Sequence, residues 1–209
     1  MNPFMCVLSC LRDQENGCNE WFRNSIKPSP IPYKIFLGEG CTANHADEIV
    51  LPINDSYPRL PWKVQSALNW VLKQDANYTH ILKTDCDTQV WLDRLLSSNF
   101  APYDYVGNFA DGHHPPLRPD TFAFGAGYWL SRSAAEKVVS ASVESTISVR
   151  TIPPHDRAWA EDEFVGTVLN DAHRCHDEKY MSHFLGRSYN GATNELFLLG
   201  NTFPNKTRF

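Results

Sequence analysis

The chain has no apolar run as long as a membrane span, and its first residues, MNPFMCVLSCLRDQ, lack the basic leader and long apolar core of a signal peptide. It also lacks an excess of basic charge, because 19 lysines and arginines face 24 aspartates and glutamates, for a net charge of −5. This balance disfavours nucleic acid and acidic membrane surfaces as partners. We therefore expect a soluble, cytoplasmic protein that is not secreted, with no membrane span and no nucleic-acid partner.

Cysteines are few and badly placed for disulfides. The chain has six of them, an even number, but Cys6 and Cys10 lie in an apolar, strand-like run and Cys86 stands between two aspartates. Cysteines in such positions are typical of buried thiols rather than of a disulfide framework. We expect mostly free thiols in a reducing compartment.

The chain is rich in the residues that build a core. Hydrophobic residues make up 42% of its 209 positions and aromatic residues 12%, which is enough for one well-packed domain. We expect residues 1–209 to form a single domain. The tail at residues 194–209 reads as a closing strand followed by an untethered end, a candidate junction to a longer polypeptide.

Short apolar runs alternate with segments of helical periodicity. This order of strands and helices with short connections predicts an α/β fold, a sheet flanked by helices. Strands are expected at residues 4–10, 33–38, 48–52, 78–85, 103–108 and 125–131, and helices at residues 20–26, 56–74, 91–98 and 133–142.

An aspartate pair, Asp85 and Asp87, follows the apolar strand at residues 78–85. On a strand, residues two apart share a face, so both carboxylates would converge and Cys86 between them would point away. Ligands of α/β sheets bind beyond the carboxyl ends of strands. Carboxylates there suit Mg²⁺ or Mn²⁺ that also holds substrate phosphates. The alternative is a solvated turn.

Four segments, in chain order, make the sequence resemble the β-1,3-galactosyltransferase and Fringe-like glycosyltransferases: DSYPRLPWKVQSALNWVLK, LKTDCDTQV, FGAGYWLSRSAAEKV and WAEDEFVG. In that family, a DSY-x-NLTLKT stretch precedes the Asp-x-Asp strand, and a GxGYxLS strand and an EDVxxG motif follow. The resemblance covers residues 47–170. It departs at Cys86, where the family often has a third acidic residue, and in the lack of a membrane anchor. Compact, anchorless versions are similar to enzymes of bacteria or large DNA viruses, and a viral origin would place the protein in the host cytoplasm.

The resemblance implies a GT-A type fold, a nucleotide-sugar-binding arrangement around a central, mainly parallel sheet, so that residues 1–209 would be one catalytic domain. It implies that a sugar moves from a UDP-sugar donor to a hydroxyl of a glycan acceptor, with inversion by single displacement. The implied cofactor is Mn²⁺ or Mg²⁺, held by Asp87 with Asp85 in support. His183 would complete the coordination, with His176 as its rival, although either could be an ordinary surface histidine.

The acidic run at residues 160–164 offers a general base, which the acceptor hydroxyl needs when it attacks. The family motif singles out Asp162 as this base and leaves Glu161 as its positioning partner. Phe164 and Val165 would begin the buried face of a helix here. The alternative is that the acids simply favour the positive end of that helix.

Further contacts with the substrates follow from the same resemblance. Each has a plain alternative, namely a solvated basic residue, a glycine that serves a turn, or an aromatic residue that packs in the core. Trp159 would provide a stacking face for the acceptor sugar. The nucleotide-sugar would be held by Arg12, Lys63, Asp85, Cys86, Asp87, Gly125 and Gly127.

Two other classes of protein compete with this hypothesis. A sugar nucleotidyltransferase also binds a metal through carboxylates, but it would carry a glycine- and lysine-rich phosphate loop near its N-terminus, which MNPFMCVLSCLRDQ lacks. A non-catalytic glycan-binding module would explain the aromatic residues without explaining the acidic ones.

Overall fold

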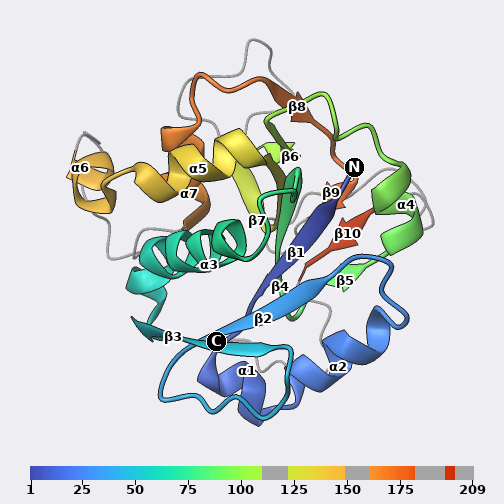
Figure 1. Cartoon of the computed structure of the whole chain (residues 1–209), viewed down its shortest axis with the longest axis vertical. Coiled ribbons are helices and arrows are strands. Elements are labelled where there is room, and N and C mark those ends of the chain that lie inside the picture. The colour runs from blue at the N-terminus through green and yellow to red at the C-terminus, as the bar shows by residue number, and fades with distance from the viewer. Residues whose placement is uncertain (110–121, 149–160, 182–195, 201–209) are drawn as a thin grey trace.

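A seven-stranded mixed sheet forms the centre of the molecule (Figure 1), with the strand order β3-β2-β1-β4-β7-β6-β8. The structure is a computed structural model that describes residues 1–109, 122–148, 161–181 and 196–200. The strands of this sheet are β1 (Pro3–Leu8), β2 (Tyr33–Glu39), β3 (Glu48–Asn54), β4 (His80–Asp85), β6 (Tyr105–Phe109), β7 (Ala123–Ser131) and β8 (Arg174–His176).

The first four strands of the sheet in sequence, β1 to β4, pair in parallel, whereas β7 runs antiparallel to both β4 and β6. A smaller sheet contains β5 (Gln89–Val90), β10 (Leu198–Leu199) and β9 (Tyr180–Met181). The mixed, mostly parallel sheet with helices confirms the predicted α/β class. The closing strand expected in the tail is present as β10.

Helices cover both faces of the large sheet (Figure 1). Their bounds are α1 (Leu11–Glu15), α2 (Cys18–Ser25), the 3₁₀ helix η1 (Tyr57–Arg59), α3 (Leu60–Gln74), α4 (Leu92–Ser97), α5 (Arg132–Ser140), α6 (Val143–Ser148) and α7 (Glu161–Val168). The helix expected at residues 56–74 is thus split into η1 and α3.

Two hydrophobic clusters, one on each face, hold these layers together. Side chains of α3, α5 and α7 pack on one face, against Phe4 and Cys6 of β1. Side chains of α2, α4 and the small sheet pack on the other, against Met5 and Val7. Because successive strand residues point to opposite faces, a strand buried on both sides must be apolar throughout, which is why β1 reads as a continuous hydrophobic run.

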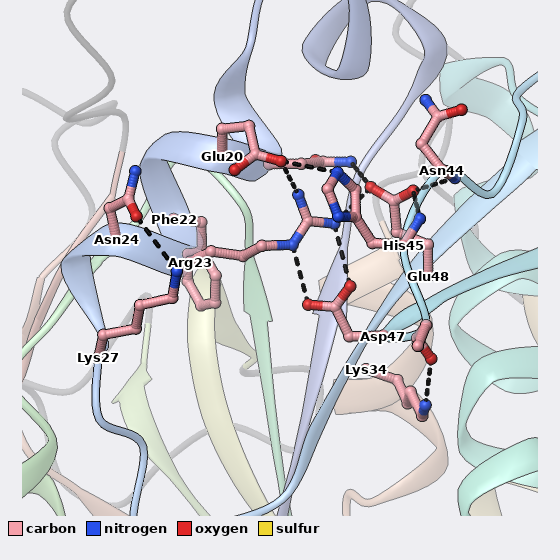
Figure 2. Close-up of polar contacts among 12 residues, drawn as sticks. Glu20, Phe22, Arg23, Asn24, Lys27, Lys34, Asn44, His45, Asp47 and Glu48 are labelled. Carbon is pink, nitrogen blue, oxygen red and sulfur yellow. Dashed lines mark hydrogen bonds and ion pairs between the residues drawn. The ribbon is translucent and has the colours of Figure 1, made fainter.

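An ion-pair cluster anchors α2 to the β2–β3 connection, and Figure 2 shows its side chains. Arg23 of α2 donates to both carboxylate oxygens of Asp47, at 2.9 and 3.1 Å, and to Glu48 and Glu20 at 2.6 Å each. Glu20 also lies 2.8 Å from His45. The partners of Arg23 therefore come from α2 itself, from the β2–β3 connection and from the first residue of β3.

All six cysteines are free, as the sequence predicted. Two of them, Cys18 and Cys86, are buried with their sulfur atoms 3.3 Å apart. As for membranes, none of the helices in the described ranges combines the length and the hydropathy that a bilayer crossing requires.

Candidate active site

A pocket opens at the carboxyl ends of β1 and β4, where ligands bind in sheets of this kind. Because β7 runs antiparallel to β4, its early residues lie beside the end of β4, and Thr84 pairs with Gly127. The start of α7 closes the same space. The pocket is lined by Leu8, Tyr57, Leu60, Lys83, Asp85, Gly125, Glu161 and Asp162.

Lys83 of β4 is the buried cation of this pocket, with only 1% of its side chain exposed. Its amino group lies 2.9 Å from Asp85 Oδ1, donates to the Gly125 carbonyl at 2.7 Å, and forms an ion pair with Glu161. The sequence reasoning missed this residue. Strand alternation was the available signal, because Lys83 and Asp85 are two positions apart on β4 and so share a face.

The two acids at the start of α7 have different surroundings. Glu161 is buried, and besides its ion pair with Lys83 it accepts a hydrogen bond from the Tyr128 hydroxyl at 3.1 Å. Asp162 is half-buried and accepts the backbone N–H of Glu163 at 2.9 Å. Burial, and then the negative charge of Glu161, raise the pKa of Asp162 to about 7. Asp162 can therefore both take up and release a proton near neutral pH.

Asp85 ends β4 with 36% of its side chain exposed. Burial raises its pKa to about 6, Lys83 opposes that rise, and the nearby charge of Asp87 adds to it. Asp87 itself does not lie on the strand. Because β4 stops at Asp85, Cys86 and Asp87 belong to the following turn, where Thr88 donates to the Asp85 carbonyl at 3.1 Å. The expectation that alternation along one strand aligns both carboxylates is therefore wrong, although the two charges do lie close together.

Cys86 faces away from the pocket. Its thiol is buried in the cluster beneath α2, 3.3 Å from Cys18 Sγ and 3.7 Å from Asp13 Oδ2. The expectation that Cys86 points away from the two aspartates is confirmed, and its side chain points into the core. Its assignment as a nucleotide-sugar contact needs correction, because only its backbone could reach a ligand in the pocket.

Asp85 and Asp87 suit a hard divalent cation that also takes oxygen ligands from phosphates and water, which is the usual way in which proteins bind Mg²⁺ with nucleotides. Within the described parts of the chain, no set of three His, Cys, Asp or Glu side chains forms a metal cage. His176 lies on β8, separated from β4 by β7 and β6, and its Nδ1 accepts from the Phe109 N–H at 3.1 Å. The structure therefore does not bring His176 to the aspartate pair, whereas His183 and Trp159 lie outside the described residues.

Lys63 points into the protein rather than toward a ligand, which corrects its expected role at the nucleotide. Its buried amino group bonds to Asp55 and to the Ser9 carbonyl. Asp55 also accepts the N–H of Leu11 at 2.8 Å, so the two side chains fix the chain just after β1. Arg12 of α1 lies in this segment with 41% of its side chain exposed, so it keeps its place as a candidate nucleotide contact.

The two glycines of β7 serve different needs. A Cβ on Gly125 would lie 3.3 Å from Glu161 Oε1 and 3.7 Å from Asp162 Oδ2, so its absence leaves space beside both acids. A Cβ on Gly127 would lie 2.5 Å from Leu198 Cδ1. Gly127 is therefore required by packing against β10, which gives no support to its expected contact with substrate.

Several solved structures share this architecture. Over 96% of this chain and 92% of the other, the fold matches a glycosyltransferase involved in the glycosylation of the major capsid of PBCV-1, with a TM-score of 0.58 and 11% identity. The galactosyltransferase LgtC, solved with donor and acceptor sugar analogs, matches over 97% and 88% with a TM-score of 0.56 and 7% identity. The fold is that of the GT-A glycosyltransferases.

Part of the sequence is similar to a known family of glycosyltransferases. The galactosyltransferase family model matches residues 39–102, the segment that runs from the end of β2 through the aspartate pair to α4. The glycosyltransferase GlyE of Streptococcus pneumoniae TIGR4 also has this fold, with a TM-score of 0.54 and 12% identity over 98% of this chain and 55% of that one. No curated protein sequence matches. The chain thus has the fold of the GT-A glycosyltransferases, and its sequence over residues 39–102 is similar to the galactosyltransferase family.

Proposed function

We propose that this protein transfers a sugar from a UDP-sugar to a hydroxyl of a glycan acceptor by a metal-dependent, inverting displacement. The observation that carries the proposal is the placement of Asp85, Glu161 and Asp162 around the buried cation Lys83, in one pocket at the carboxyl end of β4. The family match over residues 39–102 and the donor and acceptor analogs bound by LgtC support it.

Asp162 is the general base of this mechanism. It takes the proton of the acceptor hydroxyl while the acceptor oxygen forms a bond to the anomeric carbon of the donor. The bond from that carbon to the diphosphate oxygen breaks at the same time, and its electron pair leaves with UDP. A pKa of about 7 suits this task, because the carboxylate is partly ionised at neutral pH and still basic enough to hold the proton.

Glu161 and Lys83 hold the site in shape. Glu161 is fixed by Lys83 and by the Tyr128 hydroxyl, so it positions the first turn of α7 and with it Asp162. Lys83 also fixes Asp85 at the end of β4. One buried cation therefore sets the distance between the donor side and the base.

Asp85 and Asp87 would hold the Mn²⁺ or Mg²⁺, which when bound neutralises the negative charge that develops on the leaving diphosphate. Arg12, exposed on α1 just after β1, would contact the nucleotide, because β1 lies beside β4 in the sheet.

The test is calorimetry of UDP binding with and without Mn²⁺, combined with product analysis from UDP-galactose. We expect UDP affinity to depend on Mn²⁺, and the Asp87→Ala variant to lose that dependence. The exposed Asp93→Ala variant on α4 is the matched control and should bind as the wild type does. If Asp87→Ala retained metal-dependent affinity, the metal site would lie elsewhere.

The products separate the competing classes of protein. A glycosyltransferase without its acceptor slowly hydrolyses UDP-galactose to UDP and galactose. A nucleotidyltransferase would instead convert it, with pyrophosphate, to UTP and a sugar phosphate, and a glycan-binding module would leave it intact.

A further inference from the structure

Tyr57 is an aromatic side chain that core packing does not explain. It lines the pocket from η1, yet 58% of its surface is exposed. Among the large hydrophobic side chains that stand exposed in the described ranges, it is the one aromatic residue. Leu60 lines the pocket beside it. Together with Leu8 they form the apolar part of a pocket that also contains three acidic side chains.

The backbone on both sides of Tyr57 is fixed. Asp55, two positions before it, accepts the Leu11 N–H and pairs with Lys63. After it, Arg59 donates its N–H to the Ser56 carbonyl at 2.9 Å, and the Leu60 N–H donates to the Tyr57 carbonyl. Because this backbone is already ordered, little further backbone ordering is needed when a ligand packs on the Tyr57 ring, which favours binding.

The ring lies within electrostatic reach of the pocket acids. Burial raises the pKa of the Tyr57 phenol, and the negative charges of Asp162, Glu161 and Asp85 raise it further, in that order. The site thus combines an apolar ring face with carboxylates that accept hydrogen bonds. A sugar ring has the matching chemistry, since its C–H face is apolar and its rim carries hydroxyl donors.

We propose that Tyr57, with Leu60, forms the platform on which the acceptor sugar packs, so that one hydroxyl of that sugar reaches Asp162. The inference rests on the proposed function and assigns a residue that determines acceptor specificity. The acceptor is favoured over the donor because Tyr57 and Leu60 line the same pocket as the proposed base Asp162, whereas Asp87, the principal metal ligand of the proposal, is not among the residues that line it.

The experiment measures binding of three probes, methyl β-galactoside, methyl N-acetyl-β-glucosaminide and methyl β-xyloside, by saturation-transfer NMR with and without UDP and Mn²⁺. We expect the wild type to bind at least one of them. The Tyr57→Ala substitution should weaken that binding about tenfold, which corresponds to a loss of about 1.4 kcal/mol of binding free energy from the ring contact. Tyr57→Phe should keep most of it, because the ring face remains. Val50→Ala, at an exposed position on the edge strand β3, is the control.

Calorimetry of UDP with Mn²⁺ on the same variants distinguishes the outcomes. Unchanged UDP affinity in Tyr57→Ala, with glycoside binding lost, supports the platform. Loss of UDP affinity instead would move Tyr57 to the donor side and overturn the inference, as would unchanged glycoside binding in Tyr57→Ala or no glycoside binding by the wild type. If glycosides bind through Tyr57 but UDP never binds, the proposed function fails and the sugar platform stands.

Discussion

Two regions of this molecule place several carboxylates around one buried cation, and their electrostatics are opposite. Around Arg23, burial pushes the pKa of Asp47 and Glu48 up, but bonds to the guanidinium hold both below their usual range. Around Lys83, burial raises the pKa of Asp85 to about 6 and that of Asp162 to about 7. The first region is a fully paired structural anchor, whereas the second keeps carboxylates that can exchange protons.

The pKa values differ because the carboxylates around Arg23 accept more hydrogen bonds than those around Lys83. The guanidinium of Arg23 has five N–H donors in a rigid fork, and Glu48 also accepts from Asn19 and from the Asn44 N–H at 3.0 and 2.7 Å. The ammonium group of Lys83 has three N–H donors, and its partners are Asp85, Glu161 and the Gly125 carbonyl. Among the bonds that the structure describes, Asp162 therefore has no cationic partner. Shifted pKa values of this kind are a mark of functional sites.

The largest expected effect is on turnover in the Asp162→Asn variant. The amide keeps the size of the side chain but cannot accept the proton, so kcat should fall about 10²–10⁴-fold, the usual worth of a general base. UDP affinity should barely change, because the loss occurs in the transition state. Steady-state transfer kinetics and UDP calorimetry check both parts.

Glu163→Gln, the next position on α7, is the matched control and should transfer at the wild-type rate. Near wild-type transfer by Asp162→Asn would exclude it as the base, and Glu161 would be examined next. If UDP binding collapsed instead, Asp162 would belong to the donor site.

Removing each cation in turn tests whether the two regions differ in function. Arg23→Met and Lys83→Met should each lower the free energy of unfolding by roughly 3–5 kcal/mol, because each substitution leaves buried carboxylates without their cationic partner. Only Lys83→Met should also reduce kcat/KM per folded molecule. Urea unfolding measures the first quantity, and transfer assays at a temperature where both variants are folded measure the second.

Asp47→Asn offers a milder perturbation of the anchor if Arg23→Met does not fold. Folded Asp47→Asn protein with strongly reduced kcat/KM would contradict the separation of the two regions.

The pH dependence should differ between the two regions. Because the base must be ionised, kcat/KM should fall about tenfold per unit as pH drops below about 7, the pKa of Asp162. Its raised pKa means that the folded state binds an extra proton, so the contribution of Asp162 to stability declines as pH rises from its unfolded pKa toward 7. Asp47 and Glu48, with lowered pKa values, stabilise above their unfolded pKa and lose that effect as pH falls.

Rate profiles and urea unfolding between acidic and neutral pH measure these trends. Asp162→Asn should reduce the decline in stability toward neutral pH, with the part due to the raised pKa of Asp85 remaining, and Asp47→Asn should reduce the acid sensitivity. A flat kcat/KM profile across pH 6–8 would contradict the assignment of Asp162 as base.

The smallest effect is expected at Cys86, which stands between the two aspartates but faces α2. Cys86→Ser places a hydroxyl in the buried cluster with Cys18 and should lower the free energy of unfolding by about 1 kcal/mol. UDP affinity should match that of the Cys86→Ala control. A selective loss of UDP affinity in the serine variant would show that this side chain does matter to the pocket.

Much of the framework could be predicted from the sequence. The strands β1, β2, β3, β4, β6 and β7 could be found as short runs rich in apolar residues, and the central strands β1 and β7 are apolar almost throughout because helices or the small sheet cover both of their faces. The helix α3 has clear helical periodicity. Four of the short elements, α1, α6, β5 and β8, were not predicted, because too few residues form each of them to show a period. The split of residues 56–74 into η1 and α3 was missed as well, and with it the place of Tyr57.

By itself, the sequence determined the α/β class and the acids that converge on the pocket, because hydrophobic periodicity and short acidic motifs are local properties of the chain. Only the tertiary structure decided how those acids are charged. Lys83 forms an ion pair with Glu161 because the antiparallel strand β7 brings the start of α7 beside β4. Lys63 points inward because its amino group bonds to Asp55 and to the Ser9 carbonyl. Ion pairing depends on distance through space and on burial, and neither quantity is encoded by spacing along the chain.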